Sequence, residues 1–164
     1  MAMHSGGQID FQNKSSDNPI EIDLTSLSIK AGTIKLYGVG ELSTNAQSDL
    51  IITLNGVKSG YTSDMKANDR RGNGHDRAYD VEGYLAGANY AKEGATFSFE
   101  SNISIFATDP VAIAFGRAAY VYADGNTLHA TWHGRMNKIQ EIRSLQIYPS
   151  DGLISGRVEP VILA

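Results

Sequence analysis

The chain has 164 residues, a formal net charge of −4, 17 glycines and no cysteine. This length predicts one domain whose core can fold without disulfides, and the absence of cysteine excludes thiolate zinc sites and cysteine nucleophiles. The excess of acidic over basic residues argues against nucleic acid as a partner, because such binding depends on neutralising phosphates.

The first eighteen residues are polar, with Ile9 and Phe11 as the large apolar side chains that precede Pro19. They predict an extended N-terminal arm over residues 1–18, which would be disordered in a monomer and ordered by a partner in an assembly. The sequence shows neither the segments of a signal peptide nor an apolar run of about 18 residues. We therefore expect no export signal and no membrane partner.

From Pro19 onward the sequence is a succession of short segments with strand patterns. Residues 20–24 alternate between apolar and acidic side chains, which is typical of a strand with one solvated face. Residues 49–54 are mostly apolar after Asp49, with apolar side chains on successive residues, and predict a strand buried on both faces, followed by a turn at Asn55–Gly56. Further segments of this kind cover residues 33–37, 96–100, 103–106, 111–115, 119–122, 127–133, 142–148 and 157–163.

About nine to eleven strands are expected in total, and no window longer than about ten residues keeps a helical period. Many short strands without alternating helices predict an all-β protein. The expected fold is an antiparallel, jelly-roll-like β-sandwich over residues 19–164, with one long loop in addition to the arm.

The long loop is predicted over Lys58 to Ala78, a stretch rich in Gly, Ser, Asn and Asp. Loops of about twenty residues are uncommon inside a compact domain and are often functional. We therefore expect this loop and the arm to contact a partner, with the arginines pairing with acidic groups. The expected partner-binding residues are Ile9, Phe11, Tyr61, Arg70, Arg71, His75, Arg77 and Tyr79.

The sequence offers two weak metal-binding patterns. His129 and His133 share one face of a predicted strand, but four residues of strand separate them by about 13 Å, too far for one ion. In the long loop, a calcium motif beginning at Asp64 would place Lys66 at a ligand position and Asp69 where glycine is needed. We predict no bound metal and no cofactor.

No catalytic motif is present, since the Gly-x-Ser-x-Gly, Walker and dinucleotide glycine patterns are all absent. Ser59 or Ser63 could be combined with His75 and a nearby aspartate, but nothing selects such a triad over others. No pair of carboxylates stands out for glycoside hydrolysis. We predict no enzymatic activity and no catalytic residue, with a carbohydrate-active enzyme as a remote alternative.

Two strand-and-turn segments carry a family resemblance. Asp49–Gly56, followed by the Gly/Ser/Tyr stretch Val57–Tyr61, and Ile142–Pro149, followed by a serine/glycine loop, are similar to segments of bacteriophage virion proteins. The types they resemble are capsid-decoration and tail or neck-fibre proteins. The closing Leu-Tyr-Gly motif of that family stands here near the start, in Gly32–Gly38, and the C-terminus lacks it.

The resemblance implies a non-enzymatic virion structural protein, and most specifically a capsid decoration (cement) protein that binds and stabilises the assembled phage shell. Its implied partners are the major capsid protein or another virion protein, and further copies of itself in a homo-oligomer. The implied location is the virion, after synthesis in the host cytoplasm and release by lysis. The alternative is a tail-fibre or receptor-binding module that holds a glycan through Tyr61, Tyr79, Tyr84 or Tyr90, because exposed tyrosines also suit sugar stacking.

Overall fold

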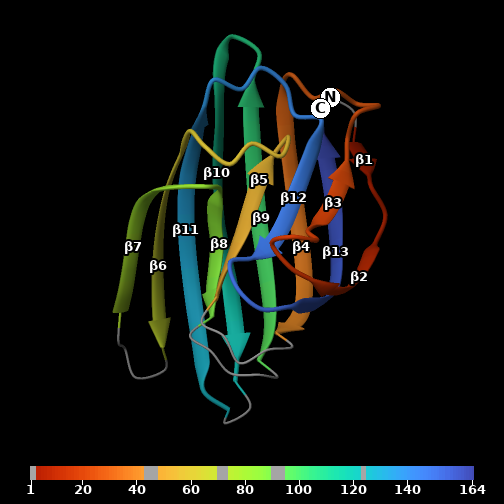
Figure 1. Ribbon diagram of the computed structural model, residues 1–164. Helices are drawn as coiled ribbons and strands as arrows, with labels where there is room; N and C mark the ends of the chain where they lie inside the picture. Colours follow the sequence, from red (N-terminus) through yellow and green to blue (C-terminus); the bar gives the residue numbers. More distant parts are fainter. Residues whose placement is uncertain (1–2, 43–47, 70–73, 90–94, 123–124) are drawn as a thin grey trace.

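The protein is a sandwich of two antiparallel β-sheets (Figure 1). The computed structural model describes residues 3–42, 48–69, 74–89, 95–122 and 125–164, and the side chains of residues 69–80, 88 and 89 lie outside that description. The described residues form 13 strands and no helix, which confirms the predicted all-β sandwich. Within these ranges no helix is long and apolar enough to cross a membrane.

The larger sheet has nine strands in the order β1-β13-β4-β9-β10-β11-β6-β7, and β2 pairs with β13 beyond the end of β1. Its strands are β1 (Met3–Ser5), β2 (Ile9–Lys14), β4 (Gly32–Leu42), β6 (Tyr61–Asp69), β7 (Gly74–Val81), β9 (Thr96–Phe106), β10 (Asp109–Val121), β11 (Thr127–Asn137) and β13 (Ile154–Leu163).

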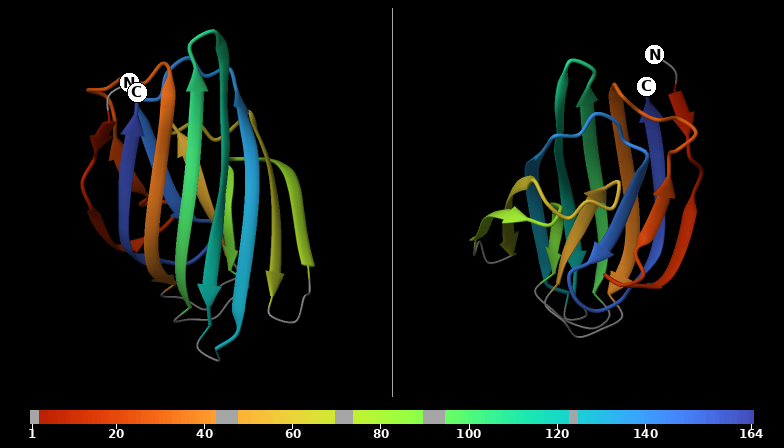
Figure 2. Two further views of the ribbon diagram at one scale, coloured as in Figure 1. Left: turned by 180° about the vertical axis from the view of Figure 1, so that it is seen from behind. Right: turned by 45° about the horizontal axis from the view of Figure 1, so that its top comes forward.

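The smaller sheet packs against one face of the larger sheet, and Figure 2 shows the two layers from behind and from above. It has four strands in the order β3-β12-β5-β8. They are β3 (Ile20–Asp23), β5 (Ser48–Leu54), β8 (Tyr84–Asn89) and β12 (Ser144–Pro149). The opposite side of the larger sheet, which the smaller sheet does not cover, is called the outer face below.

The period-two pattern decides which side chains of the larger sheet enter the core. In β11, Leu128, Ala130 and Trp132 are buried between the sheets, whereas His129 and His133 are exposed. This confirms the predicted strand, with both histidines on the same face. The same alternation recurs in β4, β9 and β10, so every second side chain of these strands points to the outer face.

The apolar run of β5 is buried on both sides, as predicted. Residues 50–54 are all buried, because β5 is an inner strand of the smaller sheet. The turn after it has φ values of 54° at Asn55 and 68° at Gly56, the left-handed pair that a tight hairpin turn requires. The Asn55 side chain also accepts a hydrogen bond from the Arg143 backbone N–H at 2.7 Å, so this turn is tied to the segment before β12.

Several aromatic rings in the core lie against glycines of a neighbouring strand. A Cβ atom at Gly38 would lie 2.1 Å from the Phe99 ring, and these two residues are register partners on β4 and β9. A Cβ atom at Gly116 would lie 2.1 Å from the carbonyl oxygen of Glu100 and 2.7 Å from Trp132 Nε1. These glycines are therefore packing residues within strands, because the rings occupy the space that a side chain would need.

The expected N-terminal arm is extended, but it pairs with its own chain. Residues 3–5 pair with the C-terminal end of β13 and residues 9–14 with its beginning. Phe11 is 7% exposed and belongs to the core, and Ile9 is partly buried against that core. The prediction that Ile9 and Phe11 bind a partner is therefore wrong, since both side chains pack against the core of their own chain.

The long loop predicted over residues 58–78 is also wrong. Most of this stretch forms the hairpin of β6 and β7, which continues the larger sheet beyond β11 and stands at one side of the molecule in Figure 1. In β6, Tyr61, Ser63, Met65 and Ala67 are buried and the residues between them are not. Strand alternation is present, but two of the four inward positions hold small or polar side chains, which weakens the apolar signal.

Candidate functional site

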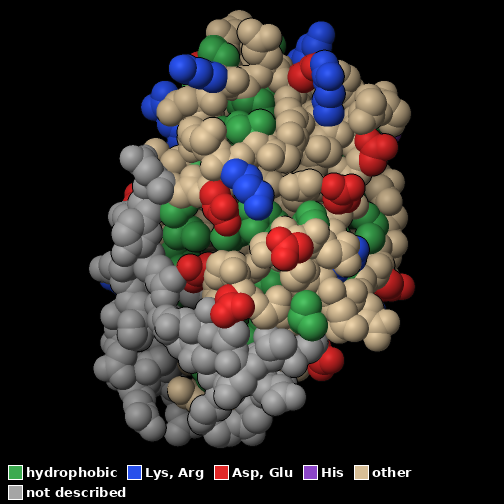
Figure 3. Space-filling model, in the orientation of Figure 1, with side chains coloured by type: hydrophobic (Ala, Val, Ile, Leu, Met, Phe, Trp, Pro, Cys, Tyr) green, Lys and Arg blue, Asp and Glu red, His purple; other side chains and the backbone are tan. Residues whose placement is uncertain are grey.

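The two broad faces of the sandwich differ in what they offer a ligand. Figure 3 shows the side of the smaller sheet, where hydrophobic side chains of the described residues appear as separate small areas among charged and polar ones. The outer face of the larger sheet instead holds a depression of about 630 Å³. This volume falls within the range of about 300–1,000 Å³ that is usual for ligand sites.

Two rows of outward-facing side chains line the depression, and the register of the strands defines them. Both rows cross β13, β4, β9, β10 and β11 in that order. The first row is Glu159, Tyr37, Glu100, Arg117 and Thr131. The second row lies two residues away on each strand and consists of Arg157, Val39, Ser98, Ala119 and His129.

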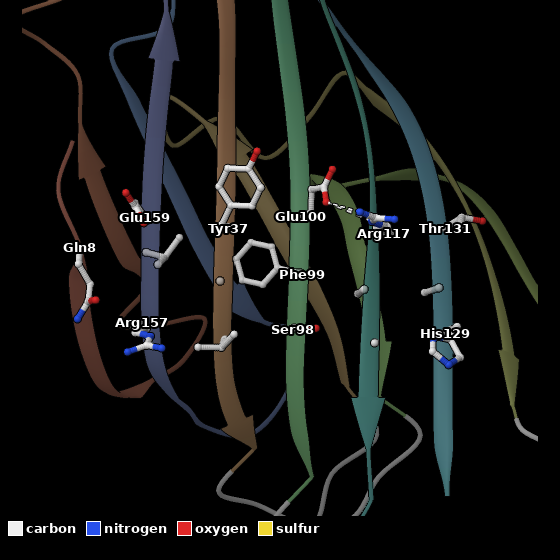
Figure 4. Close-up of a pocket in the computed structure, with 16 residues that line it drawn as sticks. Gln8, Tyr37, Ser98, Phe99, Glu100, Arg117, His129, Thr131, Arg157 and Glu159 are labelled. Atoms are coloured by element: carbon white, nitrogen blue, oxygen red, sulfur yellow. Dashed lines mark hydrogen bonds and ion pairs between the residues drawn. The ribbon is translucent and has the colours of Figure 1, made fainter. Parts of the chain in front are cut away.

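The floor of the depression arises from small side chains in the middle of the second row. Ser98 and Ala119 are register partners on β9 and β10. Larger side chains surround them, with Val39 on β4 and His129 on β11. Figure 4 shows how the labelled residues stand on adjacent strands around this floor.

An aromatic ring and polar side chains lie together in the first row. Tyr37 is 44% exposed, although an aromatic side chain in a strand is normally an inward packing residue. Its neighbour Glu100 accepts hydrogen bonds at Oε2 from Nε (3.1 Å) and Nη2 (2.9 Å) of Arg117. Because this ion pair is solvent-exposed, it stabilises the fold by at most about 1 kcal/mol, and its main effect is to hold both side chains beside Tyr37.

At the β13 end of the depression, Arg157 and Glu159 offer a second set of donors and acceptors. In the part of the chain that the structure describes, neither side chain has a hydrogen-bond or ion-pair partner. Gln8 also lines this end, and its Nε2 donates to Asp10 Oδ1 at 2.8 Å. The depression therefore combines one exposed aromatic ring with polar groups on both sides.

Tyr61 was expected to contact a partner, and the structure contradicts this because its ring is 2% exposed between the sheets. Its hydroxyl oxygen accepts the Leu54 backbone N–H at 2.7 Å. Its ring meets the edge of the Tyr84 ring with 5.1 Å between centroids. Tyr84 is itself fully buried and donates to the Ala112 carbonyl at 2.9 Å, so neither ring is available to stack on a sugar.

Replacing Tyr61 with phenylalanine tests this structural role. The change leaves the buried N–H of Leu54 without its acceptor, which costs about 1–3 kcal/mol. We expect Tyr61→Phe to lower the free energy of unfolding in urea by this amount while leaving any ligand binding unchanged. A variant with unaltered stability but weaker binding would return Tyr61 to the list of contact residues.

For the remaining expected contact residues, the structure describes the backbone at most. Arg70 and Arg71 lie outside the described residues, as does Tyr90 of the glycan alternative. His75, Arg77 and Tyr79 belong to β7, whose backbone pairs with β6, while their side chains are outside the description. Their contact roles stay predictions.

The described residues also bear on metal binding. Among them, no group of three or more His, Asp or Glu side chains is arranged to hold an ion. On the outer face, His133 Nε2 lies 3.2 Å from Asp64 Oδ2 of the neighbouring β6. This contact is a local ion pair when the histidine is protonated.

Comparisons with known proteins add little beyond the architecture. No protein-family model and no curated protein matches the sequence. Among solved structures, peanut lectin with a bound 9mer peptide aligns over 100% of this chain and 99% of its own at 8% identity and a TM-score of 0.31. The infectious bursal disease virus structure aligns over 99% of this chain and 42% of its own at 9% identity and a TM-score of 0.15. These scores are too low to support any argument about the site.

The class that the fold defines is therefore a β-sandwich. The side chains in the depression, and not the comparisons, are the basis for inferring a function. None of its lining residues was expected from the sequence. The available signal was Tyr37, a large aromatic residue at an outward position of an alternating strand.

Proposed function

We propose that the protein is a non-enzymatic glycan-binding module whose site is the depression on the outer face. The observation that carries this proposal is the exposed ring of Tyr37 next to the Glu100–Arg117 pair. An exposed aromatic face packs well against the apolar C–H face of a sugar ring. Neighbouring donors and acceptors can then bind the sugar hydroxyls and fix its orientation.

The polar groups around Tyr37 suit hydroxyl groups because they include both donors and acceptors. Arg117 and Arg157 donate only, Glu100 and Glu159 accept, and Thr131 does both. A sugar hydroxyl in water both donates and accepts hydrogen bonds. A binding site must therefore offer acceptors as well as donors to replace them. The open shape of the outer face also leaves room for a ligand that extends beyond the depression.

Replacing Tyr37 with alanine is the direct test. We expect Tyr37→Ala to weaken glycan binding by about tenfold or more, equivalent to the loss of one ring contact, while the stability of the fold stays nearly unchanged because the ring is exposed. Binding is measured on an array of immobilised oligosaccharides with neutral, uronic-acid and sulfated members, followed by calorimetry with the best binder.

Phe115 provides the matched control. It is an aromatic residue of the same outer face, 57% exposed, on β10, and it does not line the depression. Phe115→Ala should bind glycan like the unaltered protein, and Tyr37→Phe should keep most of the affinity. Equal losses in Tyr37→Ala and Phe115→Ala would contradict the proposed site, and release of shorter sugars during the assay would support the enzyme alternative.

A capsid decoration protein is the second candidate, and a separate observation favours it. Phe106, Ile113 and Phe115 are 49%, 48% and 57% exposed. All three lie on the outer face, along the β9–β10 hairpin from Phe106 at its end, at the top of Figure 1, to Phe115 in the middle of β10. Exposed aromatic and aliphatic side chains of this kind are typical of protein interfaces. In this reading the outer side of the β9–β10 hairpin, rather than the N-terminal arm, docks on the major capsid protein or another virion protein.

One set of variants distinguishes the glycan-binding function from the decoration function. Binding of the protein to empty phage shells should be lost in Phe115→Ala and kept in Tyr37→Ala if the decoration function is correct. The reverse pattern on glycans supports the glycan-binding function. Deleting residues 1–18 would not test docking, because it removes β1 and β2 from the sheet and Phe11 from the core.

A further inference from the structure

We infer that the depression binds a linear, uncharged glycan of several sugar residues that crosses the strands of the larger sheet. This inference rests on the proposed glycan-binding function and specifies its ligand. It follows from three features of the described residues, namely the length of the two rows, the position of the floor and the charge balance of the lining.

The length of the rows sets the size of the ligand. Both rows run from β13 to β11, and four inter-strand spacings amount to about 19 Å. Along the strands, the two rows are only two residues apart, which is about 7 Å. The depression is therefore elongated across the strands, and a single sugar would leave most of the polar side chains without a ligand group.

The outward positions next to the two rows do not line the depression. They are Lys35 and Phe115 beside the first row, and Glu41 and Val121 beside the second. At its β13 and β4 side, the depression adjoins a second hollow of about 510 Å³ that Glu41 lines. A chain that crosses the sheet along the two rows meets the small residues Ser98 and Ala119 at its middle, where the outer face leaves most space above the backbone.

The lining carries no net charge. Arg117 and Arg157 are matched by Glu100 and Glu159, and Glu100 and Arg117 already neutralise each other at 2.9 Å. The whole chain also has a net charge of −4, which repels polyanions at long range. Uncharged, hydroxyl-rich chains suit this balance better than uronic-acid or sulfated polysaccharides.

The experiment is calorimetric titration with neutral oligosaccharides from monosaccharide to hexasaccharide, in the glucose, galactose, mannose and N-acetylglucosamine series. Heparin and alginate fragments serve as polyanionic probes. We expect affinity to rise by about tenfold or more between monosaccharide and tetrasaccharide and then to level off. Because no counterions are released, affinity should be the same at low and high salt.

A tryptophan placed on the floor tests the position of the chain. Ala119→Trp should abolish binding of the longer oligosaccharides, whereas Val121→Trp, two residues along the same face of β10 and outside the depression, should leave it intact. Thermal unfolding of both variants shows that each is folded, since both positions face outward. Equal binding by the two variants would overturn the inference about position.

The outcomes distinguish the inference from the function on which it rests. A monosaccharide that binds as tightly as a tetrasaccharide, with Tyr37→Ala still defective, overturns the extended chain and keeps the glycan-binding function. Salt-sensitive binding of heparin or alginate alone overturns the uncharged ligand. If no oligosaccharide in either set binds at all, the proposed function itself is wrong.

Discussion

The fold is expected to unfold cooperatively as the pH rises from 10 to about 12, because four tyrosines among the described residues are buried in the sandwich. Burial raises the pKa of Tyr61 from 10 to about 12. It also raises the pKa of Tyr84, Tyr120 and Tyr148 well above 10. A tyrosine whose pKa is higher in the folded than in the unfolded state stabilises the fold fully below pH 10, and this contribution is lost as the pH rises toward the folded pKa.

The expected size of the effect is large. Each buried tyrosine lowers the free energy of unfolding by about 1.4 kcal/mol per pH unit above 10, so the four together lower it by about 5 kcal/mol per pH unit. A typical domain is stable by only about 5–15 kcal/mol. The measurement follows the far-ultraviolet signal of the strands and the absorbance of phenolate in the same alkaline titration.

Two outcomes of this titration are informative. Tyr61→Phe should reduce the slope of stability against pH by about a quarter, because one of four contributing groups is gone, even though the variant is less stable at neutral pH. If the phenolate signal of all tyrosines develops before the strands are lost, the buried hydroxyls ionise in the folded state and the expectation is wrong.

Alanine at Gly38 is expected to destabilise the protein by about 2–3 kcal/mol, since overfilling a packed core usually costs about 1–3 kcal/mol. The three atoms nearest to the new Cβ would all belong to the Phe99 ring, at 2.1, 2.5 and 2.8 Å. Gly116→Ala should cost at least as much, because its Cβ would meet a backbone oxygen. Urea unfolding of the two variants measures both losses.

Truncating the aromatic ring that faces each glycine distinguishes the two substitutions. Phe99→Leu should remove most of the clash at Gly38, so the double variant should be more stable than the sum of the single losses predicts, by about 0.5–3 kcal/mol. Trp132→Leu should not rescue Gly116→Ala in this way, because the carbonyl oxygen of Glu100 stays 2.1 Å from the new Cβ. Equal rescue at both sites would show that the glycine–ring packing is misinterpreted.

Much of the fold could be predicted because it depends on local pattern. Alternation in residues 20–24 and 127–133, the continuous apolar run of residues 50–54 and the Asn55–Gly56 turn each report a property of a few neighbouring residues. These features do appear as β3, β11, β5 and a tight turn. The sequence did not predict the hairpin of β6 and β7, because two buried positions of β6 hold Ser63 and Ala67. Pairing with the neighbouring strands, and not the hydrophobicity of these two residues, places them in the interior.

The site could not be predicted for a different reason. Glu100, Arg117 and Thr131 come from consecutive strands, but Tyr37 on β4 and Glu159 on β13 are far from them in sequence. Only the pairing register places all five in one row. Register between distant strands depends on tertiary packing. Sequence proximity pointed instead to tyrosines near one another in the chain, and Tyr61, the first of them, is buried between the sheets.

The two ends of the described chain meet at one point. Met3 and Leu163 are register partners on β1 and β13, and Figure 1 marks both termini side by side. Leu163 lies four residues, or about 13 Å, along β13 from Glu159 in the depression. A carrier could therefore hold this domain through either end, or insert it within a loop, and leave the outer face open. With the proposed glycan site, several copies on one carrier would bind a repetitive polysaccharide together, so that weak single sites would add up to firm attachment.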